Sequence, residues 1–158
     1  MSTLMPLYPI YVTSGARRRT TRHRRYIDPF TIRLLSGASG YTILHFRSSS
    51  YQQTTAGQHL ASRPLTYHES ILTSGGMSPF FRIHKQTIIN LLCVEGLLRY
   101  GPYGLVELDN YQTYPVARRR WQELIDRMEA MRAWGWPLAS PTPRKITQWP
   151  AGAKAENH

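Results

Sequence analysis

The sequence predicts a small α+β domain with an N-terminal β-hairpin, a C-terminal amphipathic helix and extended basic or proline-rich tails. Apolar residues alternate at a period of two within residues 30–46 and recur at helical spacing within residues 114–134, and both ends of the chain are rich in arginine or proline. The chain has 158 residues, of which 41% are hydrophobic, enough for one core of modest size. We therefore expect an arm at residues 1–28, one domain at residues 29–137 and a tail at residues 138–158.

The arm holds the densest positive charge. The chain has 20 lysine and arginine residues against 9 acidic ones, a net charge of +11, which favours a polyanionic partner, DNA more than RNA. The stretch "RRRTTRHRR" repels itself and is not expected to fold unaided. It is either a solvated tail or an arm that lies on phosphate groups, and in the second case its contacts are Arg17, Arg18, Arg19, Arg22, Arg24 and Arg25.

Three further segments follow the arm. In "FTIRLLSGASGYTILHF", residues 30–46, two β-prone runs flank a Ser- and Gly-rich turn, which predicts a hairpin. Residues 51–63 suit a short helix with Leu60 facing inward. Residues 63–79, "RPLTYHESILTSGGMSP", are rich in turn-forming residues.

A helix that ends at Glu95 is expected next, with Gly96 as its stop. Its start lies at Ser78 or at His84. Its apolar positions, Ile88, Leu91 and Leu92, should face the core, which leaves the polar residues on the solvent side: His84, Lys85, Gln86 and Asn90. After the helix, "LLRYGPYGLVELD" predicts a hairpin with Gly101-Pro102 in its turn.

The C-terminal helix is expected at residues 114–134, with Thr113 as its cap and Pro115 in its first turn. Its apolar face consists of Ala117, Trp121, Leu124, Ile125, Met128 and Met131. This helix either completes the core or forms a homodimer or assembly contact. Three cations lie near the start of this helix: Arg118, Arg119 and Arg120. The helix dipole disfavours positive charge there, so a phosphate surface, or acidic groups elsewhere in the fold, would stabilise them.

Residues 52–110 resemble the recognition helix and wing of winged helix-turn-helix DNA-binding proteins. The motif consists of Thr87, Leu91, Gly96 and the pair Leu97-Leu98, followed by "RYGPYGLVEL" as the wing. The resemblance implies a winged-helix-like core whose helix lies in the major groove. The residues that it implies as DNA contacts are Arg82, His84, Lys85, Gln86 and Asn90 from the helix region, and Arg99 and Tyr103 from the wing.

The sequence lacks the residues that several kinds of catalytic and metal site require. Cys93 is the only cysteine, which excludes an internal disulfide and a cysteine-based zinc site. The six histidines have no ligand spacing, and no phosphate-binding glycine loop, HExxH or GxSxG motif occurs. We therefore expect no cofactor, no metal site and no enzyme activity. No apolar run reaches membrane-spanning length, so we expect no membrane partner and a place in the cytoplasm or nucleoid, or alternatively in an organelle matrix.

The favoured function is that of a small DNA-binding regulator or architectural protein that uses a helix, a wing and a basic arm. Two alternatives stay open. The first is a structural RNA-binding subunit of a large ribonucleoprotein such as an organellar ribosome. The second is an inhibitor, phage-encoded for example, that binds a nucleic-acid enzyme.

The arm generates a measurable prediction. If its six arginines contact phosphates, DNA affinity should fall with salt at a log–log slope of roughly −5 from the arm alone. Deleting residues 1–25 should therefore flatten the salt dependence measured by fluorescence anisotropy. A slope that the deletion leaves unchanged would reject the arm as a DNA contact.

Overall fold

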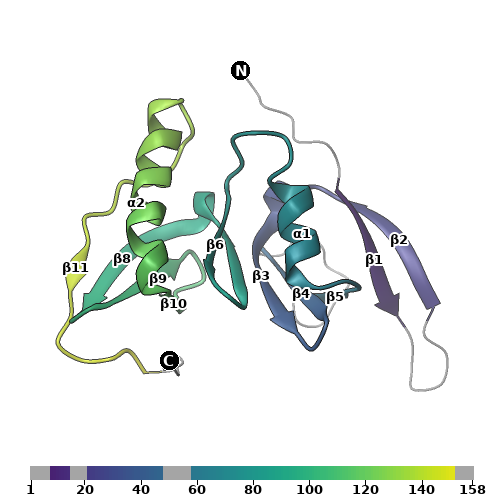
Figure 1. Cartoon of the computed structure of the whole chain (residues 1–158), viewed down its shortest axis with the longest axis horizontal. Coiled ribbons are helices and arrows are strands. Elements are labelled where there is room, and N and C mark those ends of the chain that lie inside the picture. The colour runs from purple at the N-terminus through teal and green to yellow at the C-terminus, as the bar shows by residue number, and fades with distance from the viewer. Residues whose placement is uncertain (1–7, 15–20, 48–57, 152–158) are drawn as a thin grey trace. The chain divides into compact units, whose positions relative to one another are not determined.

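The computed structural model describes residues 8–14, 21–47 and 58–151. Within them the chain is mostly β-structure, with eleven strands, two α-helices and two short 3₁₀ turns (Figure 1). It divides into two compact units, Met1–Ser78 with Gln86–Ile88, and Pro79–Lys85 with Ile89–His158. No helix that the structure describes is long and apolar enough to span a membrane.

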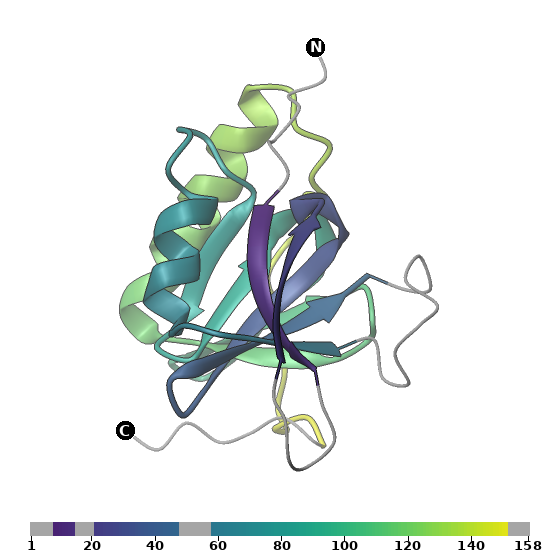
Figure 2. The same ribbon diagram turned by 90° about the vertical axis from the view of Figure 1, so that its right-hand side faces the viewer.

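The first unit is an antiparallel sheet with one helix. Its strands follow the order β2-β1-β5-β4-β3, and their bounds are β1 Tyr8–Ser14, β2 Thr21–Ile27, β3 Ile32–Ala38, β4 Tyr41–Phe46 and β5 Gln58–Ala61. β7, Thr87–Asn90, follows β3 in the order, and its first two residues belong to this unit. A 3₁₀ turn, η1, spans Pro29–Thr31 before β3. Helix α1, Leu65–Leu72, lies beside β3 and β4 (Figure 2). The core of the unit includes Ile32, Leu35, Leu44 and Leu72, each at most 2% exposed.

The second unit contains a four-stranded sheet with the strand order β10-β9-β8-β11. The bounds are β8 Val94–Tyr100, β9 Tyr103–Leu108, β10 Thr113–Val116 and β11 Arg144–Lys145. β6, Phe80–His84, and α2, Arg118–Ala133, belong to the same unit, and α2 packs against β6 and β9 through Leu124, Met128 and Met131. A 3₁₀ turn, η2, spans Leu91–Cys93.

The predicted winged-helix-like α+β core is wrong. No recognition helix forms between Ser78 and Glu95, because this segment consists of β6, β7 and η2. Asn90 ends β7 and its side-chain Oδ1 accepts a hydrogen bond from the Leu92 N–H at 3.0 Å, which caps η2 and stops the strand. Gly96, expected to end a helix, lies inside β8 at a register shift.

The apolar spacing of residues 78–95 wrongly indicated a helix, because a short apolar run is compatible with the period of a helix and with that of a strand. Ile88 and Leu91 are three apart, as on a helix face, and both are buried. The neighbouring Ile89 is also fully buried, however, as in a strand that is covered on both faces. Phe80–His84 and Thr87–Asn90 are rich in β-branched and aromatic residues, and this composition favoured strands.

Other elements agree with the sequence more closely. β3 and β4 pair antiparallel across Ser39-Gly40, where residues 30–46 were expected to form a hairpin. β8 and β9 pair across Gly101-Pro102, where the wing hairpin was expected. The expected C-terminal helix exists, but it begins at Arg118, because the residues proposed to start it, Thr113 and Pro115, belong to β10.

Three local expectations require correction. The segment 63–79, expected to consist of turns, contains α1, and Leu60 lies in strand β5 rather than in a helix. Residues Thr21–Ile27 of the basic block form β2 and pair with β1. The block was not expected to fold unaided, because its like charges repel one another. In the structure its backbone pairs with β1, a strand without charged residues, and this pairing stabilises β2.

Two histidines of the first unit should make its stability depend on pH. Burial lowers the pKa of His68 below its ordinary 6.5, and burial together with the nearby Arg33 lowers the pKa of His45. The unfolded chain therefore binds more protons below pH 6.5, so the free energy of unfolding should fall as the pH drops from 6.5 towards the folded pKa values.

Urea unfolding at about pH 7.5 and about pH 5.5 measures this dependence. A His68→Gln variant should be less stable at the higher pH and should lose part of the pH dependence. Equal stability of the unmodified protein at both pH values would contradict the expectation.

Candidate nucleic-acid interface

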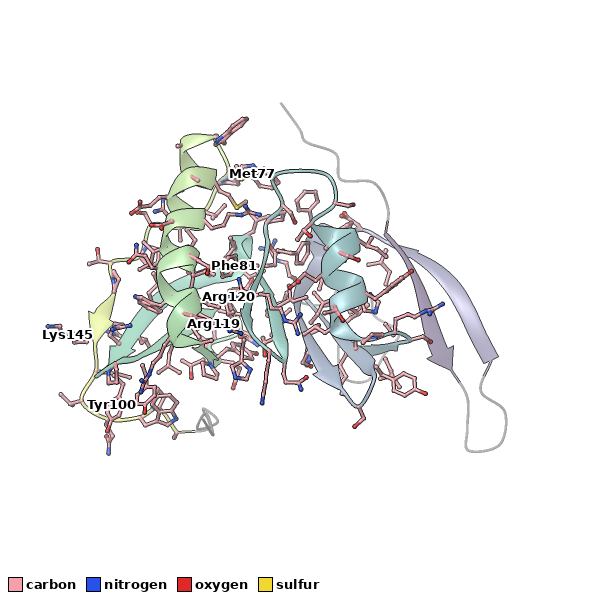
Figure 3. All side chains as sticks on the ribbon, in the orientation of Figure 1. Met77, Phe81, Tyr100, Arg119, Arg120 and Lys145 are labelled. Carbon is pink, nitrogen blue, oxygen red and sulfur yellow. The ribbon has the colours of Figure 1, made fainter. Side chains whose placement is uncertain are left out.

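The end of β6 and the start of α2 enclose a basic hollow in the second unit. It measures about 260 Å³ and is lined by Arg82, His84, Lys85, Ala117, Arg119 and Arg120. The Ala117 N–H donates to the Ile83 carbonyl oxygen at 2.8 Å, which ties the first residue before α2 to β6. Figure 3 shows Arg119 and Arg120 on the first turn of the helix. We call this set of residues the basic hollow.

The hydrogen bonds of Arg82 fix its guanidinium beside the hollow. Its Nη2 donates to the Lys85 carbonyl oxygen at 2.5 Å, and its Nε donates to the His84 carbonyl oxygen at 3.4 Å. These acceptors are backbone carbonyls, so they hold the side chain in place without neutralising its charge.

Arg120 of the hollow forms an ion pair with Glu123. Its Nη1 lies 2.9 Å from Oε2 of Glu123, one turn along α2. Both side chains are exposed, at 37% and 54%, so this ion pair is weak and solvent-screened. Lys85 and Arg119 are exposed and form no ion pair with any residue that the structure describes.

The start of α2 adds to the positive potential. Ala117 precedes the helix without a side-chain cap, and no acidic residue lies in the first turn. The first N–H groups of a helix carry a partial positive charge and can bind an anion. The three arginines Arg118–Arg120 should be repelled by this end of the helix, so an anion that contacts both would stabilise the arrangement.

A second group of cations stacks on aromatic rings next to the hollow. The Arg118 guanidinium carbon lies 4.9 Å from the centre of the Tyr103 ring, and that of Arg99 lies 5.0 Å from the centre of the Trp121 ring. Stacking holds a guanidinium through the ring face and leaves its N–H groups able to donate. The β8–β9 hairpin and the start of α2 are joined by these two pairs.

Gly104 makes the approach of Trp121 possible. A Cβ atom on Gly104 would collide with the Trp121 ring, and Gly104 itself is buried in β9. The ring therefore lies flat against the backbone of the hairpin, between this glycine and Arg99. The absence of a side chain at position 104 sets the distance between α2 and the sheet.

Half of the site residues expected from the sequence come together in the second unit. Arg82, His84, Lys85, Arg119 and Arg120 line the basic hollow, and Arg99, Tyr103 and Arg118 form the stacked group. They lie on strands, a turn and the start of α2, and not on one recognition helix.

The other expected residues lie elsewhere. Asn90 is fully buried and caps η2, so it cannot present its amide to DNA. Gln86 is exposed but belongs to the first unit, where its carbonyl oxygen accepts from the Gly37 N–H at 2.9 Å. Arg22, Arg24 and Arg25 lie in β2, and Arg17–Arg19 fall outside the described residues.

The C-terminal segment was expected to be an extended tail whose tryptophans anchor it to its own domain or to a partner subunit. In the structure Trp149 lies edge-on to Tyr100 and Tyr103, with its ring centre 5.7 and 6.3 Å from theirs. Strand β11 was not expected, and the β-branched residues Ile146 and Thr147 in "RKITQW" are the signal that could have indicated it.

The comparisons with known proteins decide the family. The sequence model described as "LytTR: LytTr DNA-binding domain" matches residues 24–129, which is more than half of the chain. The chain belongs to the LytTR family. The expectation of a DNA-binding domain is confirmed at that level, and the winged helix-turn-helix assignment is wrong.

A solved structure shows the same LytTR fold. It is the LytTr DNA-binding domain of a Bacillus cereus protein described as a methyl-accepting/DNA response regulator. The TM-score is 0.56 at 14% identity, and the match covers 78% of this chain and 96% of the other. No curated protein matches the sequence. The β-rich LytTR fold replaces the predicted winged-helix-like core.

The contact between Gly104 and Trp121 generates a prediction. Gly104→Ala should displace the indole ring and lower the free energy of unfolding by about 1–3 kcal/mol, as overpacking of a close contact does. Chemical denaturation measures the effect. Gly75→Ala is the matched control, because no heavy atom lies within 4 Å of a Cβ placed there. Equal stability of the two variants would contradict the packing argument.

Proposed function

We propose that this LytTR protein binds duplex DNA and regulates transcription, with the basic hollow on the phosphate backbone. The observation that carries the proposal is the hollow itself, where Arg82, Lys85 and Arg119 converge from β6, the following turn and α2. Family membership supports DNA as the polyanion. Nothing in the comparisons favours the ribonucleoprotein or phage alternatives.

The residues of the hollow suit two roles in a DNA complex. Arginine and lysine side chains and the helix N-terminus are typical phosphate contacts, which position a protein on the duplex. His84 lines the same hollow, and an imidazole can donate or accept a hydrogen bond at a base edge. The proposal therefore assigns backbone contact to Lys85 and Arg119, and groove contact to His84.

Substitution at the hollow tests the proposal. Lys85→Gln and Arg119→Gln should each weaken binding about tenfold, because a charge-assisted hydrogen bond contributes roughly 1.5–3 kcal/mol. Each should also reduce the steepness of the salt dependence by about 0.9, the value for one phosphate contact. Fluorescence anisotropy with a labelled duplex at several salt concentrations measures both quantities.

Arg144→Gln is the matched control. Arg144 is exposed, lies in β11 of the same unit and does not line the hollow. It should retain the salt slope of the unmodified protein. Unchanged affinity and slope in Lys85→Gln and Arg119→Gln would reject the hollow as the DNA contact.

The basic arm requires a gentler test than deletion. Removing residues 1–25 would remove all of β1 and most of β2, so a loss of binding would also report lost structure. Replacing Arg17, Arg18 and Arg19 with glutamine leaves both strands intact. A reduced slope in that variant supports contact by the arm, and a retained slope restricts the interface to the folded units.

A selection from a random duplex library at two salt concentrations identifies the target. An enriched motif that survives the higher salt supports a regulator that reads bases, because phosphate contacts alone carry no sequence information. A structured RNA serves as the competitor, and preferential binding to it would reject DNA as the target.

A further inference from the structure

The segment after α2 is built into the second unit although it lies beyond the LytTR match, which ends at residue 129. β11 pairs in parallel with β8, with Arg144 opposite Leu98 and Lys145 opposite Arg99. The Ile146 N–H donates to the Arg99 carbonyl oxygen at 2.8 Å. We call residues 138–151 the C-terminal extension.

Contacts on either side of β11 hold the extension in place. Before it, Nη1 of Arg132 donates to the Ala139 carbonyl oxygen at 2.8 Å. After it, the Trp149 ring meets Tyr100 and Tyr103 in two T-shaped contacts. The backbone at Lys145 is therefore fixed, and less conformational entropy is lost when its side chain binds a ligand.

The register fixes the face on which Lys145 lies. Directly paired residues of neighbouring strands share a face of the sheet, so Lys145 lies on the same face as Arg99. That face carries α2, because Arg99 stacks on Trp121. Arg144 is one residue earlier and lies on the opposite face.

Lys145 and Arg99 are the two cations in a row of paired residues that ends beside the start of α2. Directly paired residues form one row across the four strands of the sheet. Its members, in order, are Lys145, Arg99, Gly104 and Val116, and Val116 lies just before Ala117 and α2. Three strand spacings make this row about 14 Å long. Gly104 and Val116 are buried, so the phosphate contacts of this row can come only from Lys145 and Arg99.

Neither Lys145 nor Arg99 forms an ion pair with any residue that the structure describes. Lys145 is exposed, projects from β11 at the outer edge of the sheet (Figure 3), and forms no ion pair with any described residue. Arg99 and Arg118 face aromatic rings, which do not neutralise a charge. A row of cations without counter-charge is a surface that attracts a polyanion.

We propose that the C-terminal extension is a second DNA contact, in which Lys145 binds a backbone phosphate beside Arg99. This inference rests on the proposed function. It assigns to residues outside the family match a direct part in DNA binding, and it gives Trp149 the role of a positioning residue that holds the extension at the hairpin.

The test compares neighbouring cations on opposite faces. Lys145→Gln should reduce the steepness of the salt dependence of duplex binding by about 0.9, and Arg144→Gln should leave it unchanged. Both side chains are exposed, so circular dichroism and the thermal midpoint should match those of the unmodified protein. Equal slopes in the two variants, whether reduced or retained, would overturn the inference.

Arg119→Gln separates this inference from the proposed function. A reduced slope in Arg119→Gln with a normal slope in Lys145→Gln overturns the contact by the extension alone. Normal slopes in both variants overturn the DNA-binding hollow and the extension together.

A Trp149→Ala background tests the positioning role. When the extension is no longer anchored, Lys145→Gln should have little further effect on the slope, whereas Trp149→Phe should restore that effect. An undiminished effect of Lys145→Gln in the Trp149→Ala background would overturn the role of Trp149.

Discussion

The close approach of Trp121 to the backbone at Gly104 is the constraint on which the second unit depends. It sets the start of α2 against the β8–β9 hairpin, and the bond from Ala117 to the Ile83 carbonyl sets the same point against β6. Cations on strands from different parts of the sequence therefore lie close to the start of α2. The interface follows from packing, since no single element carries it.

The arginine side chains of the second unit are held by different kinds of contact, which allows several of them to lie close together. Arg82 is oriented by backbone carbonyls, Arg99 and Arg118 by aromatic rings, and Arg120 by Glu123. The aromatic rings fix the guanidinium groups of Arg99 and Arg118 without cancelling their charge. The surface is organised before any ligand arrives, which reduces the entropy that binding would cost.

The sequence predicted the hairpins and the C-terminal helix because their signals are local. Turn residues at Ser39-Gly40 and Gly101-Pro102, and a long apolar period in α2, specify those elements without tertiary information. The segment from Phe80 to Asn90 was misread because its apolar spacing fits a helix as well as a strand. Arg82, Lys85 and Arg119 were identified by residue type, but only the fold shows that they line one hollow.

The two residues of β11 have a consequence for the behaviour of the protein in solution. Without them, β8 would be the outermost strand on that side and would expose unpaired N–H and C=O groups. Such an edge can recruit a strand from another molecule and lead to aggregation. Arg144 and Lys145 pair with part of the β8 edge and carry charged side chains, so the extension also disfavours edge-to-edge association of the sheet.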